Sequence, residues 1–336
     1  MTQEGVLRRA SHILRVMPAL IAAAVTQAGP VPATAQNYPE RTVTIVVPFT
    51  PGGTTDLLAR LLAGKLEQRF GKPFVVENRP GAGALTASVA VAHAAPDGHT
   101  LMVSPSSAMA ANVTLYKKLP YDPATDFAPL ALLVRTPFVL AVNPALRITS
   151  VADLVARAKA APDTLAFASS GPGTPHHLFA ELFQTLTGTR LTHVPYKGVA
   201  PALNDVVAGH VQVIFTDVAP ALGMIRDGRL TALGVTSKAR VAALPGVAPL
   251  DDSVKGFDAT SWQMAIAPAA TPAGVISTLN HEITRIVAEP EVVAQAVATG
   301  MLPVEASSPD VLRDFVRSEI TKWAAVVQKA GIAQSQ

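Results

Sequence analysis

Residues 47–56 read Val47-Pro-Phe-Thr-Pro-Gly-Gly-Thr-Thr-Asp56 and join a strand pattern to a helix pattern. Before them, residues 41–47 alternate polar and apolar side chains, as a half-buried strand does. After them, residues 57–66 form an apolar helix pattern. The first N–H groups of a helix are unpaired and carry a partial positive charge, so they attract anions. This stretch therefore predicts a glycine-rich turn that holds a small anion, a feature shared by nucleotide enzymes, phosphate-binding proteins and solute receptors.

The composition narrows the class of protein. The chain has 336 residues, enough for two domains, and 49% hydrophobic against 15% charged residues excludes a disordered chain. The net charge is +3, of which residues 1–35 contribute +2 through three arginines and one glutamate, leaving about +1 for the rest. Such a balance argues against a nucleic-acid partner. Cysteine is absent, which excludes disulfides and thiolate metal sites.

The N-terminus has the pattern of an export signal. Arg8 and Arg9 form a charged start, residues 17–25 are mostly apolar, and Ala33-Thr34-Ala35 resembles a small-residue cleavage site. We expect residues 1–35 to be a signal peptide cleaved near Ala35. The mature chain lacks a later apolar run near the ~20 residues that span a bilayer, so we expect a soluble protein in the periplasm of a Gram-negative cell. The alternative is a short amphipathic tail on a cytosolic protein.

Strand and helix patterns alternate from residue 38 onward, which predicts an α/β fold with mainly parallel sheets. Expected strands cover 42–47, 73–77, 100–103, 131–134, 138–142, 165–168, 192–194, 211–215, 231–235 and 261–267. Expected helices cover 54–70, 85–93, 151–160, a stretch that follows Pro175 and ends at Leu186, 200–207, 218–226, 272–287 and a last helix from Ser308, whose apolar stripe predicts a docking face. Ligands of open α/β sheets bind beyond the carboxyl ends of the strands, so we expect a cleft between two lobes.

Three turns at strand ends combine hydroxyl groups with free backbone N–H groups: Thr50–Asp56, Ser104–Ser107 and Ser169–Thr174. Glycine lets the backbone approach a ligand closely, and serine or threonine can donate to a carboxylate. Asp217 is a fourth candidate, either as the N-cap of helix 218–226 or as an acceptor for a ligand amine or hydroxyl. Each turn can also be an ordinary helix cap, and Asp56 is more typical of a first-turn helix carboxylate than of a catalytic base.

Enzyme signatures are mostly missing. The chain has no nucleotide P-loop and no G-x-S-x-G motif. Ser170 and His176 could imitate a nucleophile and its base, but the sequence offers them no recognisable acidic partner. His176 and His177 are adjacent and point to different helix faces, which is poor spacing for metal ligands. We therefore expect no catalytic residues, no metal and no cofactor.

Many ordered segments of the chain together resemble one family, the substrate-binding receptors of tripartite tricarboxylate transporters, known as the Bug family of extracytoplasmic solute receptors. Besides residues 47–56, the segments that carry this resemblance are Tyr38-Pro-Glu-Arg41, Val76-Glu-Asn-Arg-Pro-Gly-Ala-Gly83, Ala95-Pro-Asp-Gly-His-Thr-Leu101, Leu115-Tyr-Lys-Lys-Leu-Pro-Tyr-Asp-Pro123, Asp126-Phe127, Gly173-Thr174 with His177-Leu178, His193-Val-Pro-Tyr-Lys-Gly198 with Ala200-Pro-Ala-Leu203, and Ala232-Leu-Gly-Val-Thr-Ser237. The resemblance covers nearly all of residues 38–331.

The resemblance implies a two-lobed periplasmic binding protein of type II, with the ligand cleft between the lobes. Lobe 1 would comprise residues 36–137 plus 258–336, and lobe 2 residues 138–257. A ligand carboxylate would be held mainly by backbone N–H groups, hydroxyls and waters. The expected ligand-binding residues are Phe49, Thr50, Gly52, Gly53, Thr54, Asp56, Ser104, Ser106, Ser107, Ser169, Gly173, Thr174, His177 and Asp217. The chain departs from the family after Phe215, where Thr216-Asp217 replaces the frequent Phe-Asp-Asn pattern and displaces the carboxylate by one residue.

The resemblance also implies the function. We expect a periplasmic receptor that captures a small organic carboxylate and delivers it to the membrane subunits of a tripartite tricarboxylate-type transporter. We expect it to act as a monomer without a nucleic-acid partner. The alternative is a sensory receptor that presents the bound carboxylate to a two-component histidine kinase.

Overall fold

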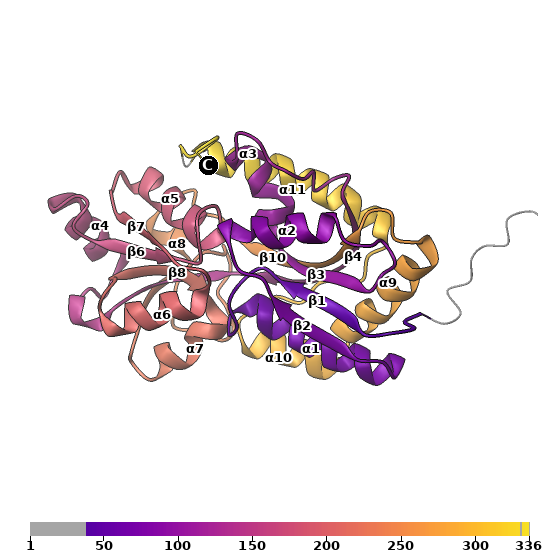
Figure 1. The fold of residues 1–336 in the computed structure, drawn as a ribbon. Helices are drawn as coiled ribbons and strands as arrows, with labels where there is room; N and C mark the ends of the chain where they lie inside the picture. Colours follow the sequence, from indigo (N-terminus) through magenta and orange to yellow (C-terminus); the bar gives the residue numbers. More distant parts are fainter. Residues whose placement is uncertain (1–37, 330, 336) are drawn as a thin grey trace, which may run out of the picture. The chain divides into compact units, whose positions relative to one another are not determined.

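A computed structural model describes residues 38–329 and 331–335 (Figure 1). The predicted signal peptide, residues 1–35, lies outside the described residues. The described chain forms two five-stranded sheets, one with strand order β2-β1-β3-β10-β4 and one with order β7-β6-β8-β5-β9. This confirms the α/β class expected from the sequence, with one sheet for each lobe.

The first sheet is covered by helices on both faces. Its strands are β1 (Val43–Val47), β2 (Phe74–Asn78), β3 (Thr100–Pro105), β4 (Phe127–Thr136) and β10 (Ser261–Pro268). The helices that follow or cover them are α1 (Thr54–Phe70), α2 (Leu85–Ala92), α3 (Asn112–Leu115), α9 (Ala273–Val287), α10 (Pro290–Ala298) and α11 (Pro309–Lys329), with a short 3₁₀-helix η2 (Ala82–Ala84) and a single π-helical turn η3 (Ser107–Ala111). Alternate side chains of β1 serve the two faces: Ile45 and Val47 pack with α1 and α9, whereas Val46 packs with α2 and α11.

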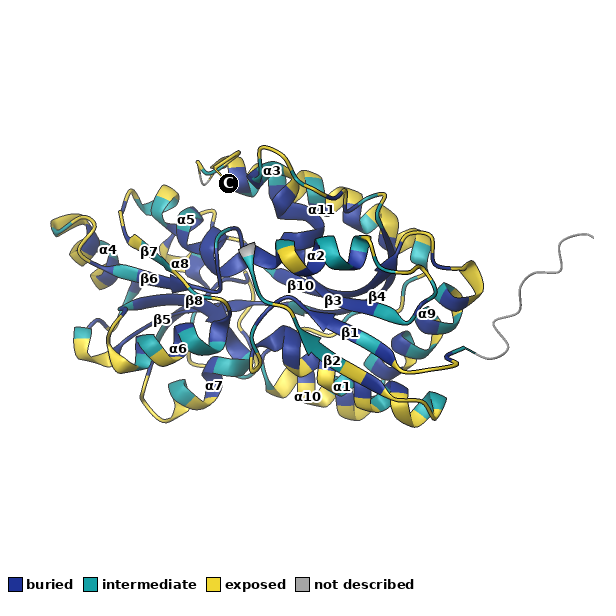
Figure 2. Ribbon diagram, in the orientation of Figure 1, coloured by how far each residue is buried: buried dark blue, intermediate teal, exposed yellow. Residues whose placement is uncertain are grey.

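The second sheet repeats this layering. Its strands are β5 (Phe138–Val142), β6 (Ala166–Ser169), β7 (Thr192–Pro195), β8 (Val213–Asp217) and β9 (Thr231–Val235). Its helices are α4 (Val151–Ala160), α5 (Pro175–Thr187), α6 (Val199–Ala208), α7 (Val218–Arg226) and α8 (Leu250–Ser253), with the short turn η4 (Pro144–Leu146). Ile214 packs with α6 and α7, whereas Phe215 packs with α4 and α5 on the opposite face. Figure 2 shows buried residues concentrated in the strands and in the helix faces that meet them.

The expectation of mainly parallel sheets is wrong. Among the described strands, four of the eight neighbouring pairs are antiparallel, and all four involve β5 or β10. Each of these two strands follows a strand of the other sheet in the chain and lies between an edge strand and the central strand of its own sheet. Neither strand follows a crossover helix of its own sheet, and such a crossover is what places the next strand parallel. The local sequence patterns do not show that the chain crosses from one sheet to the other before β5 and before β10.

The two connections between the sheets lie side by side. The chain leaves the first sheet at Thr136, where β4 ends, and enters the second at Phe138, where β5 begins. On its return, Ala259 donates its N–H to the Thr236 carbonyl at 3.2 Å, while Phe138 donates its N–H to Thr236 Oγ1 at 2.8 Å. Thr236 thus ties the outgoing and the returning segments together, and it is fully buried.

Helix α11 docks on the first sheet through a buried carboxylate. Glu319 Oε2 accepts hydrogen bonds from two indole groups, Trp262 Nε1 on β10 at 2.5 Å and Trp323 Nε1 on α11 at 3.0 Å. The Trp323 ring also stacks on Phe179 of α5, with ring centroids 6.0 Å apart, so α11 contacts both sheets' layers. The expected apolar stripe supplies buried residues such as Leu312, although Val311 is exposed.

Replacing Glu319 with alanine should lower the free energy of unfolding by about 2–3 kcal/mol, because two buried indole N–H groups lose their acceptor. Denaturant titration measures this change. The matched control is Asp314→Ala on the same helix, whose side chain is 78% exposed and which should change stability by about 0.5 kcal/mol or less. Equal effects of the two substitutions would contradict the role assigned to Glu319.

Candidate functional site

The first turn is held in shape by its own aspartate. Gly52 adopts φ +95°, a left-handed conformation that favours glycine, and Gly53 is the N-cap of α1. Asp56 accepts hydrogen bonds from the Gly52 N–H at 3.0 Å, from Arg60 Nε at 3.0 Å and from Asn78 Nδ2 at 2.9 Å. Burial acts to raise the pKa of Asp56, but these hydrogen bonds outweigh it and hold the pKa below its usual range. Asp56 therefore braces the turn, with both oxygens engaged by the protein.

A small cavity of about 20 Å³ lies where the loops of the two sheets meet. Its lining residues are Phe49, Gly53, Thr54, Thr55, Pro105, Phe138, Ser170, Pro175, His176, Val199, Asp217, Ser261 and Gln263. A second cavity of about 210 Å³ adjoins it, since Phe49 and Ser170 line both. The inner cavity has room for about one water molecule. Its lining includes two ionisable groups, His176 and Asp217.

The first-sheet side of the inner cavity presents hydroxyl groups at the N-terminus of α1. Thr55 Oγ1 donates to Gln263 Oε1 at 3.2 Å, which links α1 to β10. Thr54 Oγ1 is buried and has no hydrogen-bond partner among the described residues. Buried hydroxyls are nearly always paired in native proteins. An unpaired hydroxyl beside the first N–H groups of a helix is suited to donate to an anionic oxygen.

The second-sheet side carries a continuous chain of hydrogen bonds. Ser170 Oγ lies 2.8 Å from His176 Nδ1, and His176 Nε2 lies 3.0 Å from Asp217 Oδ2. The Phe138 ring meets the imidazole edge-on, with centroids 4.8 Å apart. Asp217 stands at the N-cap position of α7 but makes no side-chain cap hydrogen bond. The sequence shows no recognisable acidic partner for Ser170 and His176, but the fold supplies Asp217, 41 residues after His176.

These three residues have the connectivity of a catalytic triad, with the imidazole turned round. In the familiar serine hydrolases the carboxylate holds Nδ1 and the serine meets Nε2. Here the serine meets Nδ1 and the carboxylate meets Nε2. The arrangement can move a proton between a hydroxyl and an imidazole and can fix the direction of that hydroxyl.

Most of the predicted residues of the third turn support the loop rather than face the inner cavity. Ser169 Oγ pairs with His193 Nε2 at 2.6 Å, and Thr174 Oγ1 donates to the Gly171 carbonyl at 2.7 Å. His177 Nδ1 accepts from the Gly173 N–H at 3.1 Å, and its ring stacks on His193 at 4.2 Å between centroids. The adjacent histidine, His176, is the one that lines the cavity.

The structure brings four of the predicted residues, Phe49, Gly53, Thr54 and Asp217, into the lining of the inner cavity. The other predicted residues do not line it. Thr50, Ser104 and Ser107 each have a buried hydroxyl without a partner among the described residues. Ser106 Oγ pairs with Ser261 Oγ at 2.8 Å, and Ser261 is itself a lining residue.

Several lining residues are not among the ligand-binding residues that the sequence predicts, and the reason differs between them. Ser170 and His176 resemble a nucleophile and its base, but the sequence shows no acid beside them. Ser261 and Gln263 lie on β10, more than 200 residues after the first turn, and alternate on one side of an ordinary strand. No local motif marks them, because their role arises only when β10 inserts beside β3.

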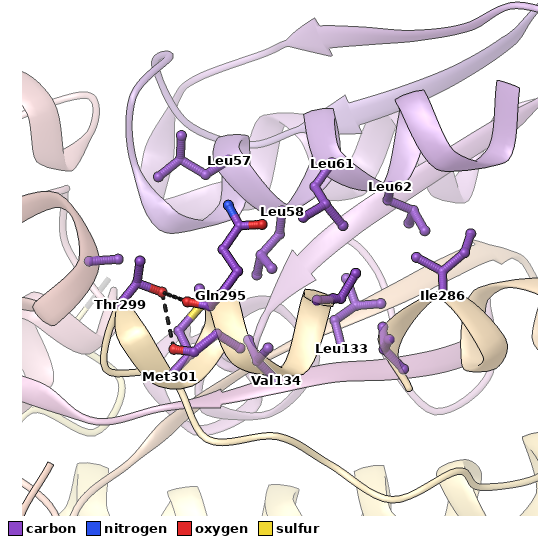
Figure 3. A pocket seen from close by; sticks show the side chains of 14 residues that line it. Leu57, Leu58, Leu61, Leu62, Leu133, Val134, Ile286, Gln295, Thr299 and Met301 are labelled. Atoms are coloured by element: carbon purple, nitrogen blue, oxygen red, sulfur yellow. Dashed lines mark hydrogen bonds between the residues drawn. The ribbon is translucent and has the colours of Figure 1, made fainter. Parts of the chain in front are cut away.

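The described part of the chain also contains an apolar pocket of about 130 Å³ (Figure 3). Leucines of α1, among them Leu58, Leu61 and Leu62, face Leu133 and Val134 of β4 across it. Its lining has no charged side chain, so it does not suit a carboxylate. Among the described residues, no helix has the length and apolarity needed to cross a membrane, and no cluster of histidine and carboxylate side chains could hold a metal ion.

The comparisons with known proteins decide the family. The family model described as "Tripartite tricarboxylate transporter family receptor" matches residues 58–332. The chain belongs to this receptor family. Protein BugT of Bordetella pertussis is 38% identical over 323 residues, covering 96% of this chain and 98% of that protein. A protein of the tcbD-tcbE intergenic region of a Pseudomonas species is 36% identical and covers 86% of each chain. The resemblance to Bug-family solute receptors is therefore confirmed.

Solved structures agree with this assignment. Rpa4515 of R. palustris with adipate is 36% identical and has a TM-score of 0.85 over 88% of this chain and 99% of that chain. MatC from Rhodopseudomonas palustris with bound malate is 33% identical, with a TM-score of 0.83 over 86% of this chain and all of that chain. The periplasmic binding protein BugD is 32% identical, with a TM-score of 0.84. They confirm the two-lobed binding-protein fold.

One half-buried histidine beside the site, His193, makes a pH-dependent contribution to stability. Burial, and secondarily the charge of His177, lowers the pKa of His193 to about 3, from the ordinary 6.5. Between these two pKa values, His193 is protonated in the unfolded chain but neutral in the folded protein. Between about pH 6.5 and about pH 3 this difference lowers the free energy of unfolding as the pH falls.

His193→Gln should flatten the loss of stability on acidification within this window, because glutamine keeps a polar contact for Ser169 but does not titrate. Thermal melts over the pH series measure the slope. His281→Gln is the control, since this histidine is 66% exposed and should leave the slope as it is. A slope that stays unchanged in His193→Gln would show that His193 does not carry the effect.

Proposed function

We propose that the protein is a periplasmic receptor that captures a small organic carboxylate between its two lobes. The observation that carries the proposal is that the α1 N-terminus, with the unpaired hydroxyl of Thr54, and the Ser170 hydroxyl meet at one small cavity, beside a second cavity of about 210 Å³ that Ser170 also lines. Helix N-termini and hydroxyl donors suit a carboxylate without any arginine. Two relatives solved with adipate and with malate support the same ligand class.

The remaining parts of the proposal follow the family. Residues 1–35 direct export and are cleaved near Ala35, and the mature chain acts as a monomer in the periplasm. The ligand is delivered to the membrane subunits of a tripartite tricarboxylate-type transporter, which recognise the closed form. The membership of the chain in this transporter receptor family supports that delivery step.

Binding works by closure of two lobes, which we place at residues 36–137 plus 258–336 and 138–257. Three close approaches across the cleft support this. The Thr50 N–H donates to the Lys197 carbonyl at 3.4 Å. A Cβ on Gly53 would lie 2.8 Å from Val199 Cγ1, and a Cβ on Gly198 would lie 2.0 Å from Thr50 Oγ1. The loops of the two sheets therefore touch with no room for a further methyl group.

The proposal predicts carboxylate binding that depends on Thr54. Calorimetry against a panel of short mono-, di- and tricarboxylates should find at least one ligand, and the same ligand should raise the melting temperature by mass action. Thr54→Val should weaken that binding about tenfold through loss of one hydrogen bond to a charged group. Thr321→Val, exposed on α11, is the control and should bind as the wild type does. A protein that binds no carboxylate of the panel would refute the proposed function.

Lobe closure predicts a second effect. Gly198→Ala should weaken the same carboxylate by about tenfold or more, since the new methyl group meets Thr50 only when the lobes close. The backbone of Gly198 is extended, with φ 175°, so alanine adds no backbone strain and the melting temperature of the free protein should stay near the wild-type value.

The control is Gly223→Ala in α7, where an added Cβ meets nothing within 4 Å. Alanine also favours a helix over glycine, so this variant should bind normally and melt at the same or a higher temperature. Undiminished affinity in Gly198→Ala would mean that binding does not need the close contact between Gly198 and Thr50.

A further inference from the structure

The apolar pocket of Figure 3 is separate from the two cavities at the strand ends. It lies between α1, β4, α9 and α10, and Ala219 of α7 adds one contact from the second sheet. It shares no lining residue with either cavity. Its volume is about 130 Å³, and none of the described residues that line it is charged. The chemistry of this pocket therefore differs from that of the proposed carboxylate site.

The pocket is a gap between two packed groups of apolar side chains. Part of its lining, Leu62, Leu133 and Ile286, belongs to the core between the first sheet and helices α1 and α9. Another part is a small separate cluster of Leu58, Val134, Ala296 and Met301. Protein interiors seldom keep a void larger than a water molecule, because the atoms around such a void lose contacts. A space of about 130 Å³ between two packed clusters is large enough to hold a small molecule.

Helix α10 is held at both ends, which keeps the pocket open. At its N-cap, the Glu289 carboxylate pairs with Lys65 of α1, with 2.8 Å between Oε2 and Nζ. Beyond its C-terminus, Leu302 and Arg135 of β4 exchange backbone hydrogen bonds of 2.8 and 3.0 Å. Between these two anchors the helix presents Ala296 to the pocket, and the methyl group of alanine is too short to fill it.

The lining offers little to a water molecule. An ordered water needs about two to four polar partners, and the polar side chains of the lining are Gln295 and Thr299. Thr299 Oγ1 already donates to the Gln295 carbonyl at 2.8 Å. The Gln295 side chain is exposed and extends toward the leucines of α1, so water can solvate its amide from outside the pocket (Figure 3). An aliphatic cavity of about 150 Å³ stays dry and takes up benzene, and we expect the same behaviour here.

The pocket is reachable from solvent. Leu57 lines it with 47% of its surface exposed, and Leu61, one turn further along α1, is half-buried. A small molecule can therefore enter beside α1 without unfolding of the core. An ionised ligand would lose its hydration and find no opposite charge in the lining, which excludes charged molecules. The volume and the lining together select an uncharged, apolar ligand.

We propose that this pocket is a second ligand-binding site, which takes an uncharged apolar molecule the size of a single six-membered ring. The ligand lies against Leu62, Leu133 and Val134, where its dispersion contacts replace those that the empty pocket lacks. This inference goes beyond carboxylate capture and does not depend on it, because the two sites share no residue.

The experiment titrates the mature chain, residues 36–336 with isotope-labelled leucine, valine and isoleucine methyl groups, with two probes that share one ring. Toluene is uncharged, and benzylammonium adds a positive charge to the same skeleton. Toluene should shift the methyl signals of the lining, such as those of Leu62, Leu133 and Val134. These shifts should saturate with a Kd of about 1 mM, since so small a ligand makes few contacts. Benzylammonium should leave the same signals unchanged.

Ala296→Leu tests the location, because the larger side chain fills the pocket. It should lower the affinity for toluene at least about tenfold, while the melting temperature of the free protein stays the same or rises, as it does when a cavity is filled. The matched control is Ala294→Leu on the same helix, which adds the same atoms at an exposed position outside the lining and should keep the wild-type Kd. If Ala296→Leu does not fold, the positions of the shifted methyl groups in the wild type still decide the location.

Several outcomes would overturn the inference. Toluene shifts that do not saturate, or that fall on methyl groups outside the lining, would do so. Benzylammonium binding as tight as that of toluene, or a folded Ala296→Leu variant with the wild-type Kd, would do the same. None of these results bears on carboxylate capture, which is tested by its own ligand panel, so the failure of one proposal can be told from the failure of the other.

Discussion

The structure depends on the close approach of backbone to backbone where the loops of the two sheets meet. Gly83 adopts φ +60°, and a Cβ on it would lie 2.1 Å from the carbonyl oxygen of Pro172. A Cβ on Gly173 would lie 2.1 Å from Leu115 Cδ2. Because glycine has no side chain, the loops of the two sheets approach closely at these points. The inner cavity between them has room for about one water molecule. A weak hydroxyl or backbone donor gains strength in such a dry site, because little solvent competes with it.

This closure sets the chemistry of the groups inside. Asp56 accepts a hydrogen bond within the first turn, and Asp217 pairs with His176. Neither carboxylate therefore faces an anionic ligand without a partner from the protein. The other polar groups that line the inner cavity beside them are neutral, among them the unpaired Thr54 hydroxyl at the α1 N-terminus and the Ser170 hydroxyl, which pairs with His176. In the proposed function, such a site would bind an anion with fixed dipoles instead of a buried arginine. It thereby avoids the cost of desolvating a second full charge.

Much of the fold was predictable from local patterns. The strand before residue 47 and the helix after residue 53 follow from periodicity, and the first turn was recognised because glycine, threonine and aspartate gather at that junction. The direction of β5 and β10 was not predictable, since it depends on where each strand inserts. The residues of the site likewise include some that local patterns predict and some that they do not. Thr54 and Asp217 could be singled out from their positions at strand ends, whereas Gln263 could not, because its partner Thr55 lies 208 residues away.

The family, the α/β class and the hydroxyl-rich turns at the strand ends follow from the sequence alone, because each is a local feature whose motif carries its own geometry. Which side chains of those turns meet depends on how the strands are arranged in the sheets. His176 and His177 are neighbours in the chain, yet a helix turns successive residues by about 100°, so one faces Asp217 and the other stacks on His193. Likewise, Ser170 has an acid at the end of its chain of hydrogen bonds only because β6 and β8 lie side by side in one sheet.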